Sequence, residues 1–237
     1  MSYSFSQIKA IYECGFKYKC YYIDKISEPS GINALFGQAI HKIFKNIISD
    51  SLERKQTLAL WKGCFENEVS SNRELIVIKN YEFWLKRGYP VIQKFISSKD
   101  KFDIQTIIKI EERNSSVYNG DEFSYVCDMV YKNSLNEIVV LDYKTGKQKE
   151  TDFYQLVFYA LLMGIPINKF CLYYVWDGPV WFSNVKYLDS TKKYIDEGVK
   201  IIKKGEFKKN PTKNCKYCYF MKKQICDTIA KEEVTKG

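Results

Sequence analysis

One segment constrains the fold more than any other: after Glu137 comes an apolar run over 138–141 that ends in Asp142, a spacer and Lys144. Its β-branched residues predict a buried strand, and an Asn-Ser turn signal precedes it. Alternate side chains of a strand share a face, so we expect Asp142 and Lys144 to lie about 6 to 7 Å apart on one side. The chain therefore needs a sheet in which this strand is buried and its last residues are polar.

The order of elements predicts an α/β fold with a mixed sheet. Apolar spacing predicts helices over 6–22, about 36–47 and within 52–98, then strands at 104–110, 123–131 and 137–144, a helix over 151–163, strands at 170–176 and 180–185, and a helix from Asp189, its N-cap, to about 204. We expect a single domain over 1–237. Its parts are an N-terminal helical part (1–102), a core (103–205) and a cysteine-rich tail (206–237).

Composition excludes several classes of protein. With 46% hydrophobic and 16% aromatic residues the chain can bury a core, so it is not a disordered scaffold. No apolar run reaches the roughly 20 residues that span a bilayer, and the first residues lack the plan of a signal peptide. We therefore expect a cytoplasmic protein with no membrane partner. A net charge of +9 favours a polyanionic partner.

A second acid, Asp128, lies in the strand before Asp142. Regular alternation predicts that Asp128 shares a face with Val130, and that Cys127 and Met129 take the opposite face. If the two strands are neighbours, both carboxylates and the Lys144 amine meet at adjoining strand ends.

This combination suits metal-dependent hydrolysis of a phosphodiester. Oxygens of Asp128 and Asp142, with the backbone carbonyl of Tyr143, are ligands that Mg²⁺ or Mn²⁺ prefers. The Lys144 ammonium can orient water or stabilise charge on the phosphate. The alternative is a surface ion pair at a strand end, because Asp-x-Lys is a common tripeptide.

The spacing of Asp128, Asp142 and Lys144 resembles the PD-(D/E)XK nucleases, and specifically their RecB-like branch, although Cys127 replaces the proline of the name. In that branch a later helix carries Gln-x-x-x-Tyr, here Gln155 and Tyr159. An earlier helix carries Gly-x-x-x-His, and the matching residue is His41, the only histidine in the chain.

The resemblance implies a restriction-endonuclease-like fold and a role for each of these residues. His41 would be a metal ligand together with Asp128 and Asp142, and Glu111, or alternatively Glu112, would add a carboxylate. Gln155 and Tyr159 would support the site or contact DNA. Without the resemblance, the interpretation of Gln155 is a buried glutamine whose amide forms hydrogen bonds with backbone groups.

A cysteine group lies near the C-terminus: Cys215 and Cys218 form a CxxC turn, and Cys226 follows. Three thiolates at this spacing indicate a metal centre that needs a fourth ligand. The resemblance extends to nucleases with one early and three late cysteines on a 4Fe-4S cluster, namely AddB-type helicase-nucleases and the iron-sulfur nuclease of CRISPR adaptation. It implies that Cys14 is the fourth ligand. Cys20 is the alternative, and zinc remains possible.

The sequence thus predicts an iron-sulfur-containing DNA nuclease, an exonuclease on single-stranded or frayed ends. Two alternatives stay open: a noncatalytic, zinc-stabilised nucleic-acid-binding module, and an accessory subunit beside a helicase or a CRISPR integrase. The tail mixes lysines with Tyr217, Tyr219 and Phe220, as single-strand-binding grooves do, or else it forms a solvated basic face.

Overall fold

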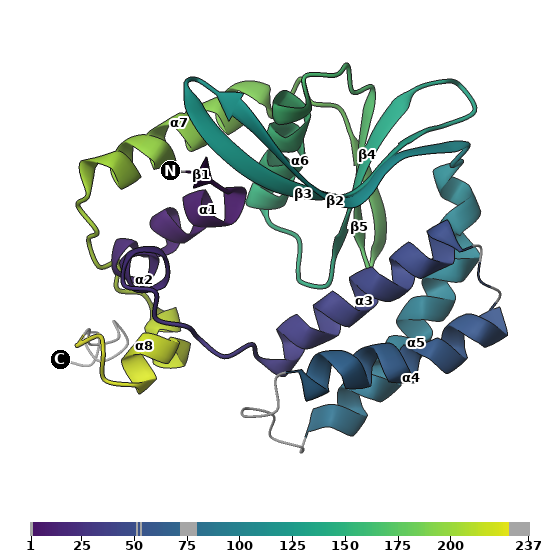
Figure 1. Ribbon diagram of the computed structural model, residues 1–237, viewed down its shortest axis with the longest axis horizontal. Coiled ribbons are helices and arrows are strands. Elements are labelled where there is room, and N and C mark those ends of the chain that lie inside the picture. The colour runs from purple at the N-terminus through teal and green to yellow at the C-terminus, as the bar shows by residue number, and fades with distance from the viewer. Residues whose placement is uncertain (1, 51, 53, 72–79, 228–237) are drawn as a thin grey trace.

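Within residues 2–50, 52, 54–71 and 80–227, which the computed structural model of the chain describes, six strands form one mixed sheet (Figure 1). The strands are β1 (Ser2–Tyr3), β2 (Thr106–Tyr118), β3 (Asp121–Lys132), β4 (Ile138–Lys144), β5 (Lys169–Tyr174) and β6 (Gly178–Phe182). β2, β3 and β4 form an antiparallel meander, and β5 and β6 are also antiparallel. β4 and β5 run parallel, and so do β1 and the start of β3. The mixed α/β sheet predicted from the sequence is therefore confirmed.

Helix α6 (Glu150–Met163) connects the parallel strands β4 and β5. Parallel neighbours need a crossover of a dozen or more residues, which a helix usually provides. α6 packs on the sheet, and it ends at Gly164, whose φ of 63° is the left-handed conformation that glycine adopts readily. The sequence predicted this helix to within one residue.

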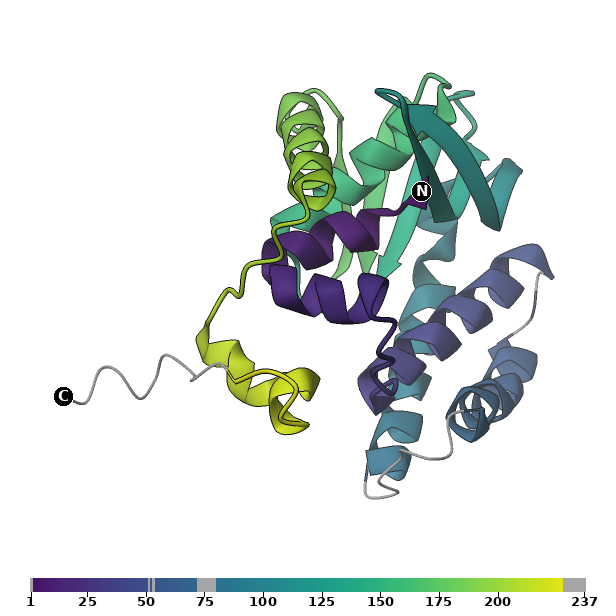
Figure 2. The same cartoon turned by 60° about the vertical axis from the view of Figure 1, so that its left-hand side comes forward.

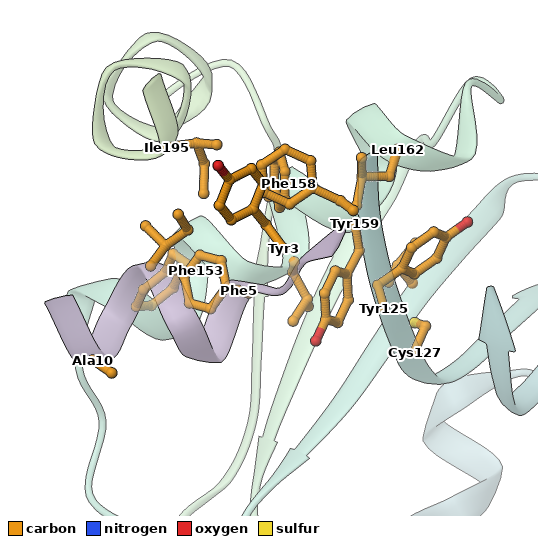
Figure 3. Close-up of a cluster of buried hydrophobic side chains, with 14 of the residues drawn as sticks. Tyr3, Phe5, Ala10, Tyr125, Cys127, Phe153, Phe158, Tyr159, Leu162 and Ile195 are labelled. Atoms are coloured by element: carbon orange, nitrogen blue, oxygen red, sulfur yellow. The ribbon is translucent and has the colours of Figure 1, made fainter. Parts of the chain in front are cut away.

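Helices cover both faces of the sheet (Figures 1 and 2). α1 (Phe5–Glu13), α6 and α7 (Leu188–Lys204) pack on one face, where Phe5, Phe158 and Ile195 share a core (Figure 3). α3 (Ile32–Ser49) and α5 (Tyr81–Ser98) pack on the other face, and α4 (Arg54–Ser70) packs against both of them. β5 is buried on both faces, as expected for a strand with a parallel neighbour inside a sheet. No helix in the described part of the chain combines the length and apolar composition needed to span a bilayer.

The β2–β3 hairpin is longer than predicted. The strand expected over 104–110 is β2, which runs to Tyr118 and pairs with β3 along most of its length. Asn119 and Gly120 form the turn with φ of 49° and 81°, and positive φ at both positions is the type I′ geometry that suits a twisted hairpin. Residues 111–118 are mostly polar, so the strand is held by pairing rather than by an apolar face.

The first predicted helix, 6–22, is interrupted at Cys14. α1 ends before this residue, whose backbone is extended, and α2 (Gly15–Tyr18) and a π-helical turn (Lys19–Ile23) follow. Position 15 requires a glycine, because a Cβ there would lie 2.7 Å from the backbone nitrogen of Lys208. The N-terminal segment and the chain after α7 therefore pack backbone to backbone, and Phe16 N donates to Lys208 O at 3.3 Å.

The N-cap predicted for the last long helix is wrong. α7 begins at Leu188, so Asp189 lies in its first turn and Tyr187 is the N-cap. Of the helical region 52–98, residues 53 and 72–79 lie outside the described residues, as do 228–237 of the tail. The short helix α8 (Tyr219–Lys222) belongs to the described part of that tail.

Gly88 fixes the packing of α5 on α4. A Cβ at this position would lie 2.1 Å from the ring of Trp61, which is fully buried and donates from Nε1 to the Leu85 carbonyl at 2.9 Å. A glycine inside a helix costs about 1 kcal/mol relative to alanine, so its presence here reflects the need for close contact.

Gly88→Ala should lower the free energy of unfolding by about 2 kcal/mol, because the new methyl group overlaps the Trp61 ring. Gly63→Ala in α4 is the matched control, since a Cβ there meets nothing within 4 Å. It should be neutral or stabilise by up to about 1 kcal/mol. Urea unfolding measures both variants, and equal effects would contradict this packing.

Candidate functional site

The candidate site lies where β3 and β4 separate. Their antiparallel pairing ends at Met129 and Leu141. Beyond this pair the backbone N–H of Tyr143 donates to the carboxylate of Asp128, with 2.6 Å between nitrogen and Oδ2. Asp128 is buried, and its carboxylate accepts the hydrogen bond that a paired strand would otherwise accept. We call this place, where β3 and β4 separate, the fork.

Glu111 lies on the other side of Asp128. Its neighbours in β2 pair with the residues that flank Asp128, so the two acids face each other across the ladder. Glu111 has a φ of 48°, a left-handed conformation that is strained for a residue other than glycine and that clusters at functional sites. Its Oε2 lies 3.5 Å from Lys45 Nζ of α3, whereas Glu112 is exposed. Glu111 is therefore the acid that faces α3.

His41 reaches the fork from α3. Its Nδ1 lies 3.2 Å from Asp128 Oδ1, and its ring packs edge-on against Tyr143 with centroids 5.6 Å apart. Burial alone would lower the pKa of His41, but Asp128, and more weakly Asp142 and Glu111, raise it to about 9. In this arrangement His41 is a cation that neutralises Asp128.

On the side of α6, a chain of contacts runs from Asp142 to Tyr159. Lys144 Nζ lies 2.6 Å from Asp142 Oδ2 and donates to Gln155 Oε1 at 2.7 Å. Gln155 Nε2 in turn donates to the Tyr159 hydroxyl at 2.7 Å. Figure 3 shows Tyr159 extending from α6 beside Tyr125. Asp142 and Lys144 share a face as predicted, and with side chains 5% and 18% exposed they are not a surface pair.

The two carboxylates differ in their electrostatics. Burial raises the pKa of Asp142 to about 6, against the opposing effect of Lys144, and the charge of Asp128 adds to the increase. Burial also disfavours the charged form of Asp128, but His41 and the Tyr143 N–H outweigh it and lower the pKa of Asp128. The carboxylates are thus close enough to influence each other.

The regular alternation predicted for β3 is wrong on its C-terminal side. Val130 belongs to the core under α6 together with Cys127, whereas Met129 belongs to the core under α3. The phase changes beside Asp128, near the irregular pairing of β2 between Ile107 and Lys109. Asp128 can therefore contact α3 while Asp142 contacts Lys144 on the α6 side.

Sequence reasoning missed the residues that brace the loop after Lys144. Asp152 is buried, and its Oδ2 accepts hydrogen bonds from the Lys149 N–H at 3.1 Å and from the Tyr174 hydroxyl at 3.0 Å. The sequence feature that could have indicated this role is the position of Asp152 in the first turn of a predicted helix, where an acid can cap the helix. Gly37 also contributes, because a Cβ there would lie 3.1 Å from Thr145 Oγ1.

The cysteines predicted to act together line one cavity of about 540 Å³ between the segment around Cys14 and the tail. They are Cys14, Cys215, Cys218 and Cys226. Asn210 N donates to Cys14 Sγ at 3.5 Å, and Thr212 N donates to Cys215 Sγ at 3.3 Å. Cys20 is buried and does not line the cavity.

Neither the fork nor this cavity is a preformed metal centre. Among the described residues, no three side chains of the His, Cys, Asp and Glu types are grouped so that they could hold one ion. At the fork the acids are instead paired with His41 and Lys144.

Comparison with known proteins gives a family and a fold. The family model described as the PD-(D/E)XK nuclease superfamily matches residues 2–227. The chain is similar to the crystal structure of a protein from Eubacterium rectale named "Putative exonuclease", with 13% identity, coverage of 100% of this chain and 93% of that one, and a TM-score of 0.61. A protein named SSO0001 matches with 11% identity, coverage of 81% and 84%, and a TM-score of 0.37. No curated protein matches the sequence.

Asp128→Asn should lower the pKa of His41 from about 9 towards or below its ordinary 6.5, because burial alone disfavours the imidazolium. The amide oxygen can still accept from the Tyr143 N–H, so the fork should stay intact. His41 is the only histidine, and its imidazole resonances in an NMR titration of the metal-free protein report this pKa directly. Asp103→Asn, on a half-buried acid that binds Ser134, is the control. An unchanged His41 pKa in Asp128→Asn would contradict the pairing.

Proposed function

Because the chain belongs to the PD-(D/E)XK nuclease superfamily, we propose that it is a RecB-like, metal-dependent DNA exonuclease that acts on single-stranded or frayed ends. One observation carries the proposal: Asp128, Asp142 and Lys144 meet, largely buried, at one fork of the sheet. The name of the similar E. rectale protein supports the exonuclease class.

A divalent cation fits the chemistry of the residues at the fork. The ligands would be His41, Glu111, Asp128, Asp142 and the carbonyl of Tyr143. Carboxylate and carbonyl oxygens suit Mg²⁺ or Mn²⁺, and a cation beside Asp142 would favour the charged form of this acid, which burial and the charge of Asp128 disfavour. His41 must lose its proton before its nitrogen can bind a metal, so binding releases a proton. A bound ion would stabilise negative charge on the phosphate.

Lys144 is the residue best placed to act on the substrate. An ammonium group has three donors, and here Asp142 and Gln155 engage it from two directions. The remaining donor can orient water or contact a non-bridging phosphate oxygen. Gln155 and Tyr159 then act as positioning residues, because Tyr159 fixes the amide that holds Lys144.

The tail supports a nucleic-acid substrate. Lys216 lies over the ring of Tyr217 with its Nζ 5.3 Å from the centroid, and Lys223 lies over Tyr219 at 5.9 Å. Tyr217 is 68% exposed. Exposed rings among cations are typical of surfaces that bind single strands. A helicase or CRISPR-integrase partner stays a prediction from the resemblance, and copurification tests it.

Asp142→Ala and Lys144→Ala should each reduce Mg²⁺- or Mn²⁺-dependent hydrolysis of labelled DNA by roughly 100-fold or more, because each removes a group that stabilises charge at the phosphate. The controls are Glu137→Ala and Lys169→Ala, which break a more exposed ion pair of 2.6 Å at the opposite end of β4. Circular dichroism and thermal unfolding verify folding.

Digestion of single-stranded and double-stranded DNA labelled at the 5′ or the 3′ end shows the direction of cleavage and the preference for single strands. Wild-type rates in either site variant would overturn the assignment. A wild-type protein that binds DNA but never hydrolyses it would instead favour the noncatalytic module.

We also propose that the four cysteines lining the 540 Å³ cavity bind a 4Fe-4S cluster with a structural role. Support comes from the cavity itself, which Cys14 lines together with the three cysteines of the tail, and from the backbone N–H groups that donate to the sulfurs of Cys14 and Cys215. Four protein ligands would leave no position for substrate.

Cys14→Ser should therefore lose most of the iron and the broad visible absorbance of the anaerobically purified protein. Cys20→Ser is the matched control, since Cys20 lies on the same segment but outside the cavity, and it should keep both. Iron and zinc analysis distinguishes the metals. Loss of the cluster in Cys20→Ser alone, or stoichiometric zinc in place of iron, would contradict the proposal.

A further inference from the structure

A stack of planar side chains extends from the core beneath α3 to the surface of α5. Phe36 is buried and stacks on Trp176, with centroids 6.0 Å apart and planes 7° apart. The guanidinium carbon of Arg87 lies 4.3 Å from the centroid of Trp176. Trp176 is half-buried and Arg87 is exposed, so the stack ends in a planar cation.

This stack is attached to the candidate active site. Trp176 Nε1 donates to the carbonyl of Thr145 at 3.0 Å, and Thr145 directly follows Lys144. Lys94 of α5 donates to the carbonyl of Trp176 at 2.5 Å. Because α5 and the loop after β4 both bind Trp176, the part of α5 that carries Arg87 lies beside the loop that follows Lys144.

The outer end of the stack has the chemistry of a nucleobase contact. Arg87 also lies 5.2 Å from the ring of Phe83, which is 52% exposed. Among the described residues no carboxylate pairs with Arg87, so its charge is available to a phosphate. The exposed Lys147 and Lys149 follow Thr145 in the same loop. Guanidinium planes and aromatic rings are the surfaces on which unpaired bases stack.

We propose that Arg87 and Phe83 form a platform on which one unpaired base of the DNA strand stacks next to the cleavage site. This inference rests on the proposed nuclease function and deepens it. A base inside a duplex has both faces covered, so the platform selects single-stranded or frayed substrates. Arg87 and Phe83 are specificity residues and take no part in the chemistry.

The test is binding of single-stranded oligonucleotides, each with one abasic position, measured by fluorescence anisotropy with EDTA present to prevent cleavage. The wild-type protein should bind about tenfold more weakly when the abasic site falls at the platform position. Arg87→Lys keeps the charge but lacks the plane, and Phe83→Ala lacks the ring. Both should bind the intact oligonucleotide as weakly as wild type binds the abasic one. Arg54→Lys, on the neighbouring helix α4, should behave like wild type.

The proposal is overturned if no abasic position weakens binding of the wild-type protein, or if Arg87→Lys keeps the full preference for the intact base. In that case metal-dependent cleavage that is lost in Asp142→Ala would still support the nuclease. Conversely, base-dependent binding without any cleavage would support the platform and contradict the nuclease proposal.

Discussion

The Asp128 carboxylate holds the candidate site together. One oxygen accepts the Tyr143 N–H, which joins β3 to the end of β4, and the other pairs with His41, which joins the sheet to α3. A buried carboxylate is costly unless both oxygens have partners. Here each oxygen has one partner, so the Asp128 side chain fixes how β3, β4 and α3 meet at the fork. Asp142 and Lys144 lie at the same place.

The site as described balances its own charges. His41 neutralises Asp128, and Lys144 neutralises Asp142. The pKa of His41 is raised from 6.5 to about 9, so the stabilisation from its pair with Asp128 is complete below about pH 6.5 and is lost as the pH rises through about 9. A divalent cation would take over the role of the imidazolium. If the site binds a metal through His41, as proposed, metal binding and deprotonation of His41 would be linked, and occupancy of the site would depend on pH.

How far the site could be predicted depends on the regularity of each element. The shared face of Asp142 and Lys144 follows from the strand period, and the contact of Gln155 with Tyr159 follows from helical i, i+4 spacing. The faces beyond Asp128 were predicted wrongly, because counting by two assumes a regular strand. The side chains of β3 change phase beside Asp128, opposite the left-handed backbone of Glu111 and near the irregular pairing of β2, and none of these features leaves a signal in the composition.

Periodicity within a segment does not predict contacts between distant segments. The meeting of Cys14 with the tail was expected only from the resemblance, and the contact of Trp176 with Arg87 was not expected. Closing a loop of about 200 residues between Cys14 and the tail costs roughly 4 to 5 kcal/mol in chain entropy. The close approach of Gly15 to Lys208 and the packing of α1 on α7 already bring these segments together. A cluster bound there would thus stabilise a junction that packing has formed. Likewise, the place of Arg87 depends on how α5 packs against the end of β5, and periodicity within either segment carries no information about that packing.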